Sequence, residues 1–530
     1  MRPLPRPLQI LTALLLLAGA CSSDGGDLER AEGPSSTAGP STTADEGRPA
    51  DGEEPTEGAD EGGDVLRLGL AGPMSLDPAA ISPASVSSMI LVDLVHDTLT
   101  EVDGEGRPQP GLASFDANED RTLWRFTLGE DATFGDGTPI TADDVVASLD
   151  RVRSQGGASL AAIALEDVAA ITAVDPRTID IGLAAPSAVL PEVLASPLYG
   201  IVDRDLLPTA VGAPLNPSGA HDVEVTAPDR LVLERRRGEG PDTIELRLFP
   251  DDAAAYDAMS AGELDWSPVP VDRLGDAGTE FGLGGLVPFH ATLLLGVNPN
   301  AEPLARAPLR QAISLAIDRA TLTEAVFGPT AQPLRGLVPA GVAGAAGECV
   351  GFCGPDVERA RQIVAQAFPE GPPPPVTLLT DDSATHRAVA GVLSEQLGAA
   401  GVELAPSSLD PTTYEATLAT RQHQLFLYST LGVGLTPASH LLAWQSSSPD
   451  NLAAYGQGLV DAAIAAARAE PDPAVRVARW REIEAAVLAD VPVVPLAQLR
   501  TVAVVREQVR GLHVRADGSI DVAGVTFPGS

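Results

Sequence analysis

The stretch Ala-Thr-Phe-Gly-Asp-Gly-Thr-Pro-Ile-Thr-Ala-Asp-Asp-Val-Val, residues 132–146, carries the clearest structural signals in this chain. Asp136-Gly137 is a turn signal, and Thr141 is a good helix N-cap because its side-chain oxygen can accept a bond from the first helical turn. Two aspartates follow Thr141, where the helix dipole favours negative charge. The apolar face of the predicted helix, which runs to Val152, consists of Val145, Val146, Leu149 and Val152. The stretch therefore predicts structure and not catalysis.

The segments around this stretch predict alternating strands and helices. Val65 to Leu70 alternates as a half-buried strand, and Val376 to Leu379 forms a second, apolar strand. Helical periodicity predicts helices over 307–319, 356–368, 384–399, 459–468 and 475–488. This alternation implies α/β lobes, and residues 65–530 are too many for one ordinary domain.

The stretch 132–146 resembles a known family when it is taken together with two neighbours, HDTLTEVDGEGRPQPGLA at 96–113 and WRFTL at 124–128. These sequences are similar to those of the family 5 solute-binding proteins of ABC importers, the oligopeptide, dipeptide and nickel class. Further stretches that resemble the family are 216–221, 261–266, 295–298, 307–319 and 491–496. The resemblance implies an α/β fold of the periplasmic-binding-protein type II kind, with lobes joined by crossover strands around a ligand cleft.

The resemblance also predicts how the chain divides into lobes. The expected ranges are lobe I at 65–85, 205–296 and 500–530, lobe II at 86–204, and lobe III at 297–499. The ligand is expected between lobes I and III.

The N-terminus has the features of an export signal. Arg2 and Arg6 precede an apolar run that ends in Leu-Ala-Gly-Ala-Cys at 17–21, and this run is too short to span a membrane. The ending resembles a bacterial lipobox, although Ala18 stands where a leucine is usual. The resemblance implies that residues 1–20 are a cleaved signal peptide and that Cys21 carries diacylglycerol. The alternative is an ordinary secretory signal with an incidental cysteine.

Acidic residues dominate the segment that follows and the chain as a whole. Residues 22–64 hold thirteen Asp or Glu and two Arg, so we predict that 21–64 is a disordered tether. The formal net charge of the whole chain is −39 at pH 7, which argues against nucleic acid or anionic lipid as a partner. The chain contains no lysine, which excludes lysine-dependent phosphate loops and Schiff-base chemistry.

Two cysteines remain once Cys21 is assigned to lipid. Cys349 and Cys353 form an even pair outside the cytoplasm, and we predict a small disulfide between them. Two free thiols are the alternative. A metal site is disfavoured because the sequence has no further cysteine and the nearest histidine in the later sequence, His386, is far along the chain.

Several residues are candidates for contact with a ligand. Residues 74–77 follow the first strand, a position that lines the cleft in the family, and the glycine-rich turn near residue 219 is a second candidate segment. Tyr414 stands where peptide binders of the family have a tryptophan. The predicted ligand contacts are Met74, Ser75, Asp77, Ser218, Gly219, His221, Tyr414, Tyr428 and Trp444. For each of these positions, packing in a turn or a core is the alternative.

One expected residue is missing from the ligand site. Peptide binders of the family have an aromatic-rich stretch ending in an acid, which pairs with the α-amino group of the ligand. The corresponding residues here, 425–437, contain no acid. Recognition of a free peptide N-terminus is therefore in doubt unless Asp77, Asp410 or Asp450 substitutes.

These observations predict a binding protein that works outside the cytoplasm. We expect the substrate-binding subunit of an ABC importer, a monomer without cofactor or metal, anchored to the membrane by lipid only. Its expected partners are a peptide or other small solute, an ABC permease and the ATPase of that permease. A binder of chelated nickel or another metal, and a peptide-signal receptor of the same fold, are the alternatives. An extracellular hydrolase is disfavoured because G-x-S-x-G and H-E-x-x-H are absent from the sequence.

Overall fold

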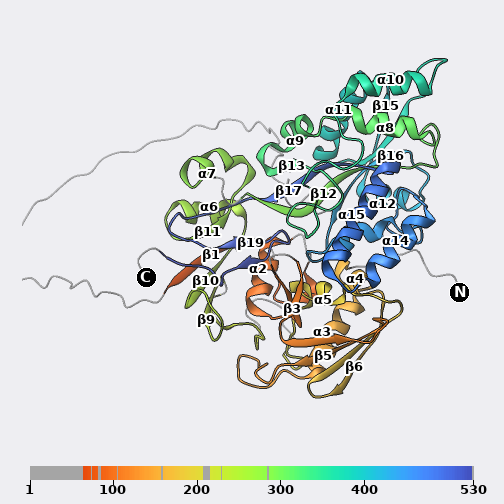
Figure 1. Ribbon diagram of the computed structural model, residues 1–530. Coiled ribbons are helices and arrows are strands. Elements are labelled where there is room, and N and C mark those ends of the chain that lie inside the picture. Colours follow the sequence, from red (N-terminus) through yellow and green to blue (C-terminus); the bar gives the residue numbers. More distant parts are fainter. Residues whose placement is uncertain are drawn as a thin grey trace, which may run out of the picture.

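The computed structural model describes residues 64–527, except 73, 82–84, 104–105, 157–158, 207–214, 228, 283–285 and 346. The predicted signal peptide, Cys21 and the tether up to residue 63 lie outside these residues. The described chain forms three bodies, which Figure 1 shows as a green and red body on one side, an orange and yellow body below, and a teal and blue body opposite. Within the described residues, no helix is both long and apolar enough to cross a membrane.

Lobe I is built on a six-stranded mixed sheet. Its strands, in spatial order, are β18 (Ala503–Val505), β11 (Trp266–Pro268), β1 (Val65–Ala71), β10 (Thr243–Phe249), β9 (Arg230–Arg235) and β8 (His221–Ala227). Helix α6 (Asp252–Ser260) packs Tyr256 and Met259 on one side, and the short α7 (Leu274–Glu280) follows. The other side packs against α2 (Val86–Val95) and the C-terminal pair β19 (His513–Val514) and β20 (Ile520–Asp521).

Lobe II contains the stretch that shows the family resemblance. Its sheet has the order β4 (Ala113–Ala117), β5 (Leu123–Leu128), β7 (Thr178–Leu183), β6 (Val168–Asp175), and a small pair, β2 (Thr100–Val102) and β3 (Pro108–Pro110), lies beside it. The predicted helix is confirmed as α3 (Ala142–Ser154). The Thr141 backbone N–H donates to Asp144 at 2.9 Å, so the two residues form a capping box. Short helices α4 (Leu160–Ala164) and α5 (Leu190–Val193) complete the lobe.

Lobe III has the second six-stranded sheet. The strand order is β13 (Ala331–Pro333), β17 (Val493–Thr501), β12 (Val287–Val297), β16 (Leu425–Leu431), β14 (Val376–Asp381) and β15 (Leu404–Leu409). Its helices are α8 (Ala307–Ala316), α9 (Arg319–Phe327), α10 (Val357–Ala367), α11 (Ala384–Ala399), α12 (Pro411–Ala419), α13 (Ala438–Leu441), α14 (Gly458–Ala469) and α15 (Pro473–Asp490). Each helix expected from periodicity is present within a few residues of its predicted bounds. The exception is 307–319, which splits because α8 ends at Ala316 and Asp318 caps α9.

Two places differ from the predicted division into lobes. β12 lies within the segment predicted for lobe I, but it pairs with β16 and β17 in the sheet of lobe III. Pairing along these two neighbours fixes the sheet to which a strand belongs, so the first crossing between lobes I and III falls before residue 287. Helix α2, predicted for lobe II, is shared: Met89 and Val92 pack in the core of lobe II, whereas Ile90 and Leu94 pack in the core of lobe I.

Candidate functional site

The three lobes meet where the two crossings between lobes I and III pass close to α2. The chain leaves lobe I before β12 and returns between β17 and β18. The turn between β19 and β20 reaches across this point, where the Ala516 carbonyl accepts a bond of 2.8 Å from the His290 amide of β12. Gly518 in the same turn lies against Phe289 of lobe III and Val86 of α2. We call this region, with the ends of α2 and β16, the three-lobe junction.

Lobe II and lobe III are joined at one side of the junction by ion pairs. Arg476 of α15 donates to Glu192 of α5, and their side chains are only 3% and 8% exposed. Arg468 of α14 pairs in the same way with Asp167, while its carbonyl accepts a bond of 2.6 Å from the Ala188 amide. Figure 1 shows α14 and α15 beside the yellow helices of lobe II. Burial raises the pKa of Glu192, although Arg476 opposes that shift.

An acidic group lies inside the junction on the lobe I side. Asp93 of α2 is 3.5 Å from Arg515 of the β19–β20 hairpin, and its side chain keeps 21% of its surface exposed. Burial raises the pKa of Asp93 to about 7, and Arg515 lowers it less than burial raises it. Asp97, one turn later, pairs with Arg237. These charges come from three segments that are distant in sequence: the C-terminal end of α2, the residues after β9, and the β19–β20 hairpin.

The predicted contacts after β1 differ in their availability. Met74 and Ser75 are half-buried, and the Ser75 hydroxyl accepts the Asp77 amide at 3.1 Å. Asp77 itself is buried, accepts the Ala79 amide at 3.1 Å and pairs with Arg151 of α3. One oxygen of Asp77 therefore caps the turn at Pro78–Ala80 and the other pairs with Arg151 of lobe II, so Asp77 is a poor partner for an incoming ammonium group.

The turn at residues 218–221 is packed against α2. The fully buried Ser218 hydroxyl donates to the Ile201 carbonyl at 2.6 Å and accepts the Asp97 amide at 3.1 Å. The Gly219 amide donates to the Val95 carbonyl at 2.9 Å, and a Cβ at Gly219 would lie 2.7 Å from that oxygen. His221 is buried in β8, which lowers its pKa. These contacts give the turn a structural role in joining lobe I to α2.

The three predicted aromatic contacts lie together, but in a core. The Tyr414 hydroxyl donates to the Leu427 carbonyl of β16. Tyr428 stacks on Phe426 with ring centroids 5.0 Å apart, and Trp444 meets the edge of Tyr455 at 6.4 Å. All three predicted rings are buried in one apolar cluster of lobe III. Ligand contact by Tyr414, Tyr428 and Trp444 stays a prediction.

The remaining predicted positions lie away from the junction or serve local structure. Asp410 caps α12 by accepting the Thr413 amide at 3.1 Å, and Asp450 is exposed. Cys349 and Cys353 are joined by a disulfide in lobe III, next to Val350, whose amide donates to the Arg335 carbonyl. Among the described residues, no three His, Cys, Asp or Glu side chains lie together as a possible metal site.

Comparison with protein families identifies the chain. The model of the bacterial extracellular solute-binding proteins, family 5, matches residues 107–451. The chain belongs to this family. The match runs from β3 through the whole of the lobe II sheet and most of lobe III, and of the three-lobe junction it includes β12 and β16 but not α2 or the β19–β20 turn. Family 5 proteins are binding proteins that work outside the cytoplasm, which agrees with the resemblance in the sequence.

Individual relatives agree over most of the chain. The dipeptide-binding protein DppE of Bacillus subtilis is 23% identical, covering 85% of this chain and 89% of its own length. The periplasmic murein peptide-binding protein MppA of Escherichia coli is 24% identical, covering 83% of this chain and 89% of its own length. The solved structure of HbpA2 from Haemophilus parasuis has a TM-score of 0.76 at 19% identity, covering 88% of this family 5 chain and 100% of its own. The unliganded open form of the murein tripeptide-binding protein MppA has a TM-score of 0.77 at 21% identity, covering 88% of this chain and 97% of its own.

Sequence reasoning missed Asp93, Arg515 and His440 of this family 5 protein. One signal for Asp93 was present, because it is the only charged residue within the apolar helix VSSMILVDLV. Arg515 and His440 have no local signal, since their surroundings come from segments distant in sequence.

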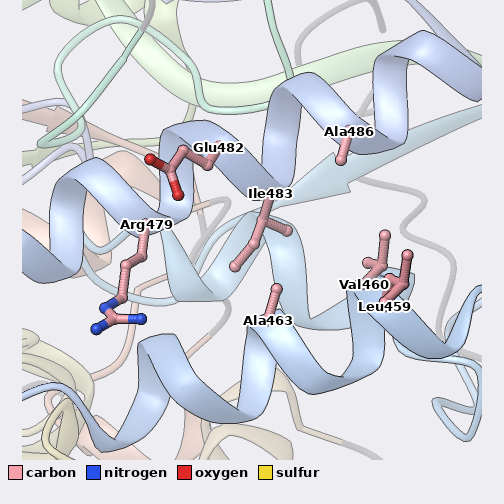
Figure 2. Close-up of a pocket in the computed structure, with 7 residues that line it drawn as sticks. All are labelled: Leu459, Val460, Ala463, Arg479, Glu482, Ile483 and Ala486. Atoms are coloured by element: carbon pink, nitrogen blue, oxygen red, sulfur yellow. The ribbon is translucent and has the colours of Figure 1, made fainter.

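A hollow of about 150 Å³ between α14 and α15 is separate from the junction. Figure 2 shows Leu459, Val460 and Ala463 of α14 facing Ile483 and Ala486 of α15, with Arg479 and Glu482 toward one end. Its lining comes from one lobe only. Closure of two lobes on a solute does not involve such a hollow.

Proposed function

We propose that this family 5 protein is the extracytoplasmic substrate-binding subunit of an ABC importer. It captures a peptide or peptide-like solute between its lobes and delivers it to a permease. The observation that carries this proposal is the family match over residues 107–451, which covers the lobe II sheet and most of lobe III, with β12 and β16 of the junction. Relatives named as dipeptide-binding and murein peptide-binding proteins support peptides as the solute class.

The connection between the lobes suits capture by closure. Lobes I and III each have their own six-stranded sheet and apolar core, so each moves as a rigid unit. The chain passes between them at β12 and between β17 and β18, and short crossings of this kind are typical hinges. A solute that touches both lobes stabilises the closed form through the contacts it makes only there.

The chemistry of the junction limits how the solute is held. Met74 and Ser75 are half-buried at the lobe I side and are proposed to contact the solute there. Residues 425–437 supply no carboxylate, and that of Asp77 is already paired with Arg151. A buried ammonium group needs such a partner, so the main contacts to the solute are uncharged hydrogen bonds and apolar surface.

The N-terminal sequence supports attachment of the protein to the cell membrane. Residues 1–20 act as the export signal, and the lipid on Cys21 holds the protein at the outer surface of the cell membrane. The acidic segment up to residue 64 lets the lobes reach the permease. The protein acts as a monomer that hands its solute to the permease and its ATPase.

Identification of the retained solute tests the proposal. Protein purified without denaturation is examined by native mass spectrometry, then unfolded so that any released molecule can be identified. We expect a peptide or peptide conjugate, and readdition to ligand-free protein should raise the melting temperature, because binding to the folded state stabilises it. Small-angle scattering should show a smaller radius of gyration with the solute. A retained metal chelate, or a released product shorter than the added peptide, would contradict the proposal.

A further inference from the structure

His440 is a buried polar residue at the lobe III side of the three-lobe junction. It belongs to α13, which follows the loop after β16, and only 7% of its surface is exposed. Its imidazole lies over Gly432 so closely that a Cβ at Gly432 would be 2.6 Å from Nε2. On another side it interacts with His290, whose amide is bonded to Ala516 of lobe I. The ring therefore lies next to the point where lobes I and III touch.

Neither ring nitrogen of His440 has a hydrogen-bond partner among the described residues. Two other buried histidines each have one ring nitrogen beside a carbonyl oxygen: His96 Nε2 lies 3.1 Å from that of Leu76, and His423 Nε2 lies 3.0 Å from that of Leu452. A buried polar group without a partner costs free energy, so such groups are rare in folded proteins. A partner outside this chain explains why His440 is kept in this position.

The chemistry of the ring indicates what that partner is. Burial, with a smaller contribution from His290, lowers the pKa of His440 to about 3, so the imidazole is neutral at physiological pH. A neutral imidazole presents one donor and one acceptor. An amide group offers the matching acceptor and donor, whereas an ammonium ion offers donors only and needs a negative charge when it is buried.

Polar side chains continue along the face of the sheet that points toward α13. Thr430 of β16 is half-buried, and its hydroxyl lies 2.7 Å from that of Thr292 on the neighbouring strand β12. Residues 428 and 430 of β16 point to one face of the sheet, and Gly432, which His440 covers, follows directly after the strand. The loop that follows reaches lobe II, where Gly434 lies close to Glu192 and Ser196.

Resting on the proposed function, we propose that His440 binds an uncharged amide or hydroxyl group of the solute and thereby selects peptides whose N-terminus is acylated. Solute closes the junction with this group against the ring of His440. His440 is a specificity-determining residue in this role. Residues 425–437 contain no carboxylate, as expected for a site that binds an acylated N-terminus and not a free ammonium group.

Two synthetic tripeptide libraries, identical except that one is N-acetylated, test this proposal on the whole mature chain. Binding is measured by calorimetry and by the melting temperature. The variants are His440→Leu, which keeps the volume but removes both nitrogens, and His440→Gln, which keeps a donor and an acceptor. His423→Leu is the matched control, because His423 is also buried in lobe III, at 8% exposure, but is bonded to Leu452.

The expected results concern both binding and melting temperature. The acetylated library binds wild type at least as tightly as the free one, and His440→Leu weakens binding about tenfold, equivalent to about 1.4 kcal/mol. His440→Gln retains more of the affinity. His440→Leu without ligand melts no lower than wild type because it loses an unpartnered polar group, whereas His423→Leu melts lower and binds normally.

The opposite results separate the inference from the proposed function. A tenfold loss of wild-type affinity on acetylation, or unchanged binding by folded His440→Leu, would overturn the inference and leave peptide capture intact. Failure of both libraries to bind wild type would overturn the proposed function and the inference with it. The wild-type comparison needs no variant, so it decides even where His440→Leu does not fold.

Discussion

Asp93→Asn should stabilise the protein at alkaline pH and much less at acid pH. Asp93 lies in the apolar helix α2, and burial raises the pKa of its carboxyl from 3.8 to about 7, against the attraction of Arg515 at 3.5 Å. Asp517 and Asp97 add to the rise. Asparagine has nearly the same shape as a protonated aspartate and carries no charge, so the variant retains the favoured form of the native state at every pH.

The sign of the effect comes from proton binding. Between pH 3.8 and about 7 the native state holds this proton and the unfolded state does not. Wild-type stability therefore falls as the pH rises through this window, and the whole contribution is lost above about 7. The free energy of unfolding changes by about 1.4 kcal/mol for each pH unit, so the whole window corresponds to a loss of stability of about 4 kcal/mol. The side chain of Asp93 is 21% exposed, so water relieves part of the burial, and we expect about half of that value.

Thermal or urea unfolding at pH 5.5 and pH 8.5 measures the effect and avoids the isoelectric point near 4.3. The stability of the wild type should fall by about 2 kcal/mol between these two values of pH if Asp93 were fully buried. Because partial exposure to water halves the effect, the stability advantage of Asp93→Asn should grow by about 1 kcal/mol from the lower to the higher pH. Asp382→Asn makes the same charge change at an exposed site and controls for the net charge of −39. An advantage equal at both values of pH, or equal to that of the control, would refute the reasoning.

Three further changes test other contacts. Glu192→Gln leaves the buried Arg476 without its charge partner, so the free energy of unfolding should fall by about 3 kcal/mol and the ligand-free protein should expand in solution scattering. An unchanged radius of gyration and melting temperature would show that this pair does not hold lobes II and III together. Gly219→Ala puts a Cβ 2.7 Å from a carbonyl oxygen of α2 and should lower the free energy of unfolding by about 1–3 kcal/mol. Gly391→Ala, in an exposed part of α11 where a Cβ meets no atom within 4 Å, should raise it by up to about 1 kcal/mol. Changes of the same sign in both variants would contradict the packing argument. Cys21→Ala should abolish incorporation of a labelled fatty acid and release the protein from the membrane fraction, and labelling as strong as in wild type would exclude Cys21 as the lipid site.

The sequence by itself determined the local elements and the family. The turn at 136–137 and the Thr141–Asp144 capping box appear as predicted because each depends on residues a few positions apart, and Val145, Leu149 and Val152 of the predicted apolar face are buried, whereas Val146 is half-buried. The same holds for α11, whose predicted and observed ranges coincide at 384–399. Helical periodicity reports only that one face is buried, and that was enough to place α3, α10, α11, α14 and α15.

Only the tertiary structure decided which polar groups are free to act. Asp77 is taken up by Arg151, 74 positions away, while Asp93 meets Arg515 across 422 positions. β12 belongs to lobe III because of its partners β16 and β17, and Tyr414, Tyr428 and Trp444 pack in one apolar cluster of that lobe. His440 is distinguished by its place beside His290 at the junction and by the absence of a hydrogen-bond partner for its ring among the described residues. The burial and pairing of a charged or polar side chain depend on every segment that surrounds it in space, and no window of sequence contains that information.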